Sequence, residues 1–92
     1  MKHGRRDANQ AEIVAALEAA GASVLDLADM GRGCPDLLVG YAGHAWLMEV
    51  KTATGKLTPD EIAFARGWHG QVHVVHSAEE ALAVIGFREW QP

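Results

Sequence analysis

The chain has 92 residues and one cysteine, Cys34, which allows a single small domain and excludes an internal disulfide. Its 49% hydrophobic and 22% charged residues are typical of a globular domain, and no apolar run reaches the roughly 18–20 residues that a membrane span needs. The net charge of −4 argues against tight nucleic-acid binding through bulk electrostatics. We therefore expect one domain over residues 1–92 with a loose basic tail over residues 1–6, no signal peptide and a cytoplasmic location.

The first third of the chain predicts a helix, a strand and a glycine-rich loop. Residues 7–10 (DANQ) have the form of a capping box, so a helix should begin there and run to about Ala20, with Gly21 as its end. Residues 22–28 are expected to form a strand, followed by the loop over residues 29–34. Pro35 then precedes the next apolar run, and proline is tolerated as the first residue of a strand.

Two apolar runs, over residues 37–41 and 45–48, predict a β-hairpin around the turn signal at residues 42–43. If Tyr41 pairs with His44 across this turn, the antiparallel register places Asp36 opposite Glu49. Both faces of these strands are apolar, so we expect helices on both sides of the sheet.

This register brings two carboxylates and a lysine together. Because strand side chains alternate between faces, Asp36, Glu49 and Lys51 share one face and Val50 turns to the other. Facing carboxylates repel unless a cation lies between them, and a neighbouring lysine suits metal-assisted hydrolysis of a phosphodiester. The alternative is a solvated Glu49 and Lys51 at a strand end, but the apolar strands around both acids favour the metal site.

The second half of the chain predicts a helix, a strand and a last helix. Thr58 is an N-cap, with Pro59 at the first helical position and Glu61 completing a capping box. Residues 71–76 (QVHVVH) are expected to be the fourth strand, and Ser77 caps a helix that reaches about Ile85. A right-handed crossover through the second helix would make the third and fourth strands parallel.

Further polar residues are candidates for the same site. Glu12 lies about 100° around the first helix from the expected buried stripe of Ile13 and Leu17. It either points into the site from the edge of the buried face or is an ordinary surface residue. The cationic candidates for contacts with DNA phosphates are Arg32, Lys56, Arg5 and Arg6.

The order αβββαβ, with Pro35-Asp36 and Glu49-Val50-Lys51 on successive strands, resembles the PD-(D/E)xK nuclease superfamily. More closely, residues 9–85 resemble the virus-type replication–repair nuclease (VRR-NUC) family, through residues 33–40, 48–52, 55–59 and 72–80. The resemblance implies an α/β, restriction-endonuclease-like αβββαβ(α) core, with a mixed central sheet flanked by helices. It also implies a stand-alone phage-like domain that works in a bacterial or phage-infected host cell.

By the same resemblance, the protein would be a metal-dependent DNA endonuclease. Asp36, Glu49 and the backbone carbonyl of Val50 would bind Mg²⁺ or Mn²⁺, and Lys51 would orient the attacking water and stabilise charge on the phosphate. Glu12 matches the first-helix acid of the family, which would act through water or a second metal.

The resemblance leaves a second class of function open. At the position of Glu61 such proteins often carry Gln, which puts in doubt any contact of that side chain with the site or with DNA. A small core and weak net electrostatics favour a homodimer, and the resemblance permits a structure-selective enzyme such as a junction resolvase. The alternative is a non-catalytic nucleic-acid or protein-binding module on the same fold, and intact Asp36, Glu49 and Lys51 count against it.

Overall fold

A four-stranded mixed sheet, in the order β1-β2-β3-β4, organises residues 8–88, the part of the protein that the computed structural model describes. β1 (Ser23–Asp26), β2 (Leu37–Tyr41) and β3 (His44–Val50) are antiparallel neighbours, and β4 (Val72–Val75) runs parallel to β3. The helices are α1 (Ala8–Ala19), α2 (Pro59–Gly67) and α3 (Ala78–Val84), and a short 3-10 helix, η1 (Ala28–Met30), follows β1. The predicted αβββαβα order and the parallel last pair of strands are confirmed, whereas the basic tail and Asp7 lie outside the described residues.

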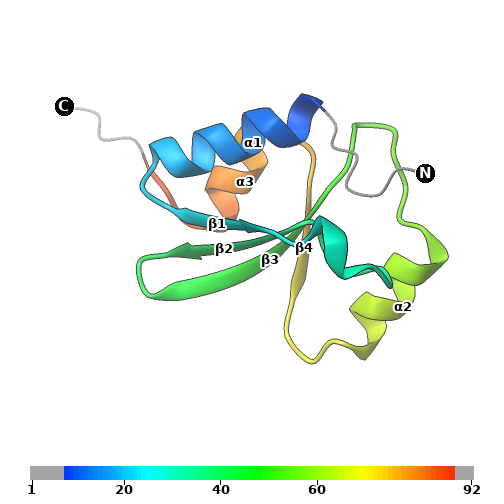
Figure 1. Cartoon of the computed structure of the whole chain (residues 1–92). Helices are drawn as coiled ribbons and strands as arrows, with labels where there is room; N and C mark the ends of the chain where they lie inside the picture. The colour runs from blue at the N-terminus through cyan, green and yellow to red at the C-terminus, as the bar shows by residue number, and fades with distance from the viewer. Residues whose placement is uncertain (1–7, 89–92) are drawn as a thin grey trace.

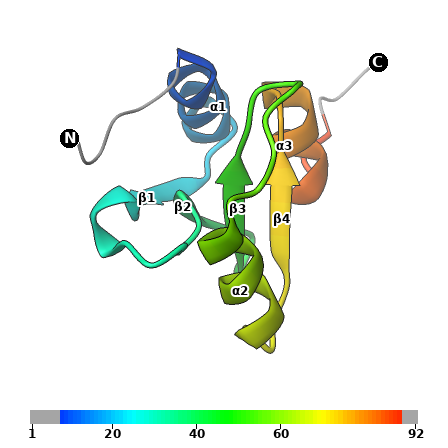
Figure 2. The same ribbon diagram turned by 90° about the vertical axis from the view of Figure 1, so that its right-hand side faces the viewer.

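The helices cover the two faces of the sheet unequally. α1 and α3 lie together over one face, and α2 lies on the opposite side (Figure 1). Figure 2 shows α2 beside β3 and β4, at the other end of the molecule from α1 and α3. The second face is therefore only partly covered, and Leu25 on β1 remains 59% exposed. The main core lies between the sheet and the pair α1 and α3, and comprises Ile13, Leu17, Ala22, Leu37, Val39, Met48, Val50, Val75, Ala81 and Ile85.

The hairpin of β2 and β3 has the predicted register. Both residues of its two-residue turn, 42 and 43, have positive φ, at 51° and 82°, which is the type I′ geometry that matches the twist of the flanking strands. Tyr41 pairs with His44, and the same register continued to the start of β2 places Asp36 opposite Glu49. The turn therefore sets which side chains meet at the far end of the hairpin.

The first strand is shorter than the predicted 22–28, because an aspartate bends the backbone at its end. Oδ1 of Asp26 accepts a hydrogen bond from the backbone N–H of Ala28 at 2.8 Å, which turns the backbone into η1. Gly21, with φ of 98°, ends α1 as predicted: the N–H of Ala22 donates to the carbonyl of Leu17, and that of Gly21 to Glu18.

The start of α2 matches the predicted capping box. Oγ1 of Thr58 accepts from the N–H of Glu61 at 3.2 Å, while Oε1 of Glu61 accepts from the N–H of Thr58 at 2.8 Å. At α3, Ser77 caps the N–H of Glu80, but the Glu80 carboxylate accepts the N–H of His76 rather than that of the cap residue. Within residues 8–88, no helix has the length and apolar character required to cross a membrane.

Candidate active site

Asp36 stands at the start of β2, directly after the buried Pro35, and its carboxylate contacts the next strand. Its Oδ2 accepts a hydrogen bond from the backbone N–H of Val50 at 2.8 Å. Because the N–H and C=O of one strand residue point to the same side of the strand, the carbonyl of Val50 also faces the side of Asp36. The first predicted acid and the predicted backbone ligand are therefore brought together.

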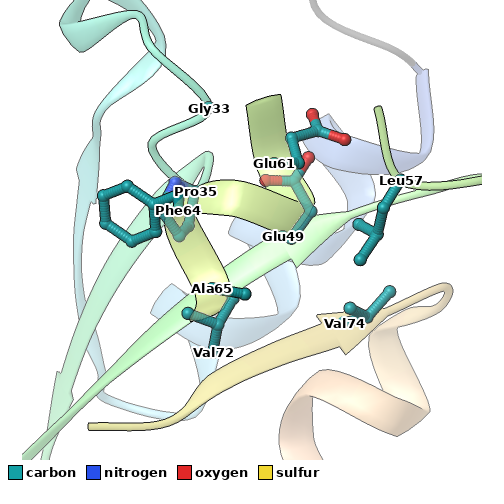
Figure 3. Close-up of a pocket in the computed structure, with 9 residues that line it drawn as sticks. All are labelled: Gly33, Pro35, Glu49, Leu57, Glu61, Phe64, Ala65, Val72 and Val74. Atoms are coloured by element: carbon teal, nitrogen blue, oxygen red, sulfur yellow. The ribbon is translucent and has the colours of Figure 1, made fainter. Parts of the chain in front are cut away.

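Glu49 is a buried acid on the face of β3 that α2 covers, and only 3% of its surface is exposed. Figure 3 shows it rising from β3 toward Glu61 of α2, at one end of a cavity of about 80 Å³. The rest of the cavity is largely apolar, lined by Gly33, Pro35, Leu57, Phe64, Ala65, Val72 and Val74. Removal of a carboxylate from water in this setting disfavours its charged form.

Burial and mutual repulsion disfavour joint ionisation of the two facing acids. Burial, followed by the negative charge of Asp36 and a hydrogen bond with Glu61, raises the pKa of Glu49 to about 9. Burial also raises the pKa of Asp36, although hydrogen bonds from Val50 and Glu49 oppose that shift. The pair therefore holds a proton to higher pH than two solvated carboxyl groups would, and the effect of burial is strong on Glu49.

Lys51 completes the group, one residue beyond the end of β3. Its Nζ lies 2.9 Å from Oε1 of Glu61 and 3.7 Å from Oε2 of Glu49. Burial by itself would lower the pKa of Lys51, but the hydrogen bond and charge of Glu61 outweigh burial and raise it. In turn, burial would raise the pKa of Glu61, yet the bonds from Lys51 and Thr58 lower it. The ammonium and the Glu61 carboxylate are therefore both ionised.

The contact between α1 and the site comes from a residue that sequence reasoning did not select. Nδ2 of Asn9 donates to the carbonyl of Lys51 at 3.1 Å, whereas Glu12 is exposed to solvent. Oδ1 of Asn9 is buried and has no hydrogen-bond partner among the described residues. Gln10 is the buried polar residue of the helix, at 6% exposure. In the sequence, Asn9 is recognisable only as a residue of the first helical turn. That position suggests a role in capping the helix and does not predict a contact with Lys51.

The glycine-rich loop packs against the start of α2. Gly33 has φ of 76°, and a Cβ at this position would collide with the backbone carbonyl group of Asp60. Cys34 follows, and burial, with the charges of Glu49 and Asp36, raises the pKa of its thiol. The thiol is thus protonated at neutral pH and poorly suited to act as a nucleophile.

The basic candidates lie in the loops and the tail. Arg32 is exposed and has a positive φ of 57°, in the loop beside Gly33, and Lys56 is exposed in the loop before α2. Arg5 and Arg6 fall outside the described residues. Both Arg32 and Lys56 are therefore accessible to phosphate groups of a bound nucleic acid.

The donor set fits a divalent cation of the hard, oxygen-binding class. Asp36 and Glu49 supply carboxylates, and the carbonyl of Val50 faces the same region. Because burial and the charge of Asp36 raise the pKa of Glu49, a nearby cation would stabilise its charged form. Across residues 8–88, no three His, Cys, Asp or Glu side chains converge as a metal cluster, so backbone oxygen and water would have to complete the coordination shell.

Comparison with known proteins bears on the fold and the family. The sequence matches no profile of a protein family and no curated protein. A solved structure described as a VRR_NUC domain is similar to this protein, with 32% sequence identity and a TM-score of 0.63. The match covers 85% of this chain and 92% of the solved one. The restriction-endonuclease-like core and the extent of this match show that the chain belongs to the VRR-NUC family of nuclease domains.

Proposed function

We propose that this protein is a metal-dependent endonuclease that hydrolyses phosphodiester bonds in DNA. The observation that carries the proposal is the meeting of Asp36, Glu49 and Lys51 at the end of the hairpin, beside a cavity open to solvent. A buried Glu49 and a half-buried Asp36 beside an ammonium are costly to maintain, and a chemical role best explains that cost.

The residues would divide the work as follows. Asp36, Glu49 and the carbonyl of Val50 would hold Mg²⁺ or Mn²⁺, which when bound supplies a Lewis acid and lowers the pKa of a coordinated water. Lys51 would donate hydrogen bonds to the attacking water or to a phosphate oxygen, where negative charge develops. Its ammonium is already ionised, so it is ready to donate without prior protonation.

Glu12 would act in the same site from the first helix. Its carboxylate is exposed on α1, while the neighbouring Asn9 is tied to the carbonyl of Lys51. From an exposed position it would act through bridging water or a second metal rather than as a direct ligand of the first. A Glu12→Gln variant would then cut DNA more slowly than the wild type. An unchanged rate would show that Glu12 is an ordinary surface residue with no role in cleavage.

DNA would be held by few cations, and this favours a dimer. Arg32 and Lys56 are the described candidates for phosphate contacts, with Arg5 and Arg6 as further candidates in the tail. With a net charge of −4, one copy would bind duplex DNA weakly, so we propose a homodimer that pairs two basic rims and two sites. Two sites would favour branched DNA, in which two strands are presented at once. Light scattering at micromolar concentration tests the dimer, and a monomer would remove that part of the proposal.

A cleavage panel tests the enzyme assignment directly. Single-stranded, duplex, flap and four-way DNA would be incubated with the protein and Mg²⁺, Mn²⁺ or EDTA. We expect metal-dependent cleavage that is lost in the Asp36→Asn and Lys51→Ala variants, each checked by circular dichroism for an intact fold. Absence of cleavage on every substrate, or equal cleavage by wild type and variants, would show that the protein is not a nuclease acting through this site.

A further inference from the structure

We propose that Glu61 is a positioning residue, which holds the Lys51 ammonium in the orientation required for hydrolysis; the inference rests on the nuclease function proposed above. A single oxygen, Oε1 of Glu61, accepts both the N–H of Thr58 at 2.8 Å and the Nζ of Lys51 at 2.9 Å. The first contact fixes the carboxylate to the helix, and the second fixes the lysine to the carboxylate.

The Glu61 carboxylate is held by contacts other than the one with Lys51. Glu61 is the third residue of α2, and its backbone N–H and its carboxylate are both engaged in the capping box with Thr58. The loop at Gly33 packs closely against Asp60 and Glu61, which limits movement of this helix turn. A lysine side chain loses rotamer entropy on ordering, so a partner that is itself held in place lowers the cost of ordering it in the site.

The contact with Glu61 also keeps Lys51 from forming a close ion pair with Glu49. The Nζ of Lys51 is closer to Glu61 than to Oε2 of Glu49, at 2.9 Å against 3.7 Å. The ammonium therefore does not close tightly on Glu49, whose oxygens remain oriented toward Asp36 and Glu61. Because an ammonium has three donors, Lys51 keeps capacity for a water or a phosphate oxygen.

Two substitutions separate positioning from simple helix capping. Glu61→Gln keeps an amide oxygen that can accept from Thr58 and Lys51, whereas Glu61→Ala removes both contacts. Glu80→Ala is the matched control, because Glu80 also accepts a backbone N–H at the start of a helix, from His76 at 2.8 Å, on α3 at the other side of the sheet. Both alanine variants lose a helix-end contact, but only one of them releases Lys51.

Kinetics of metal-loaded protein on a cleaved substrate provide the first readout. We expect Glu61→Ala to lower kcat by about tenfold to a hundredfold, the scale of a misplaced catalytic group, with KM changed by less than about threefold. Glu61→Gln should restore most of kcat, and Glu80→Ala should cleave as the wild type does. A Gln variant as slow as the Ala variant, or an Ala variant as fast as the wild type, would overturn the proposal.

Side-chain order of Lys51 in metal-free protein provides a readout that does not depend on cleavage. NMR relaxation of the Lys51 Cε group should report a rigid side chain in the wild type and in Glu61→Gln, with exposed Lys56 as the flexible reference. In Glu61→Ala the Lys51 order parameter should fall toward that of Lys56. If the wild type cuts no DNA, the nuclease proposal fails, while this measurement still decides whether Glu61 positions Lys51. An equally ordered Lys51 in Glu61→Ala would overturn the inference.

Discussion

The backbone N–H of Val50 donates to Oδ2 of Asp36 at 2.8 Å, so the first acid of the site is bonded to the strand that carries the other groups. This bond joins two segments 14 residues apart in sequence, and it orients the carboxylate at the end of the hairpin. Asp36 therefore has a structural contact as well as the proposed chemical one, and substitutions of Asp36 must be chosen to separate the two.

Asp36→Asn and Asp36→Ala should differ in stability but not in activity. The asparagine keeps an oxygen that can accept the N–H of Val50, whereas alanine leaves that part-buried donor without its partner. We expect both variants to lose cleavage, and only Asp36→Ala to lose about 1–3 kcal/mol in the free energy of unfolding. Urea denaturation and a cleavage assay on the same preparations measure the two effects. Cleavage by Asp36→Asn at the wild-type rate would contradict the role of its charge.

The pH dependence of stability should report the proton on Glu49. The pKa of Glu49 is about 9 in the folded protein and 4.5 in the ordinary, solvated state, so the folded protein holds more protons between these values. Its contribution to stability is therefore fully present below about pH 4.5 and is lost as the pH rises to about 9. In metal-free Glu49→Gln, which mimics the neutral acid, we expect the melting temperature to fall less over this range. Parallel curves for the two proteins would argue against a protonated Glu49.

Divalent metal should stabilise the native state through the two acids. A ligand that binds only the folded protein adds about 2.7 kcal/mol at a concentration one hundred times its Kd. Mg²⁺ or Mn²⁺ should therefore raise the melting temperature, and more strongly at pH 8.5 than at pH 6.5, because the metal must displace the proton from Glu49. An Asp36→Asn/Glu49→Gln double variant serves as the control and should show no increase. Equal stabilisation of both proteins would place the metal elsewhere.

Gly33→Ala should displace the first turn of α2 and so disturb the contact between Glu61 and Lys51. Gly33 and Gly86 both have φ of 76°, so alanine is strained at either position, but only at Gly33 would the new methyl collide with the backbone of Asp60. Gly86→Ala is thus the control for backbone strain, expected to cost about 1–2 kcal/mol. We expect a larger loss of stability in Gly33→Ala, together with slower cleavage, because the collision moves the helix turn that carries Glu61. Similar losses in the two variants would mean that the loop and helix adjust freely.

Salt dependence should identify the phosphate contacts. Each lost contact lowers the slope of log K against log salt by about one unit, so an Arg32→Ala/Lys56→Ala double variant should lower it by about two. Arg88 is exposed and follows α3 in the chain, and α3 lies on the face of the sheet opposite to α2 (Figure 1), so Arg88→Ala should leave the slope unchanged. Fluorescence anisotropy with a labelled four-way junction and Ca²⁺ in place of Mg²⁺ would measure binding. An unchanged slope in the double variant would exclude these two residues from the DNA contact.

Local rules were sufficient for the hairpin and the second helix. A two-residue turn with one glycine restricts the pairing of its strands to a narrow choice of register, and that register brings Asp36 opposite Glu49. The cap of α2 depends on contacts between Thr58 and Glu61, three residues apart, so it is also readable from sequence. Both features depend on short segments, whose geometry follows from local contacts rather than from packing against the rest of the protein.

Two contacts of the site could not be read from the sequence, because they depend on how the helices pack on the sheet: the contact of α1 with the end of β3, and the ion pair of Glu61 with Lys51. Whether Glu12 or Asn9 contacts the end of β3 is decided by how α1 rotates and tilts on the sheet, and a helical wheel fixes only their relative angle. The ion pair of Lys51 and Glu61 requires α2 to lie on the second face with its first turn over the end of β3. The groups that the hairpin aligns can be read from the sequence, because strand alternation and turn geometry are local. Which helix residues reach those groups, and the raised pKa of Glu49, follow from the fold, because both depend on packing and burial by distant segments.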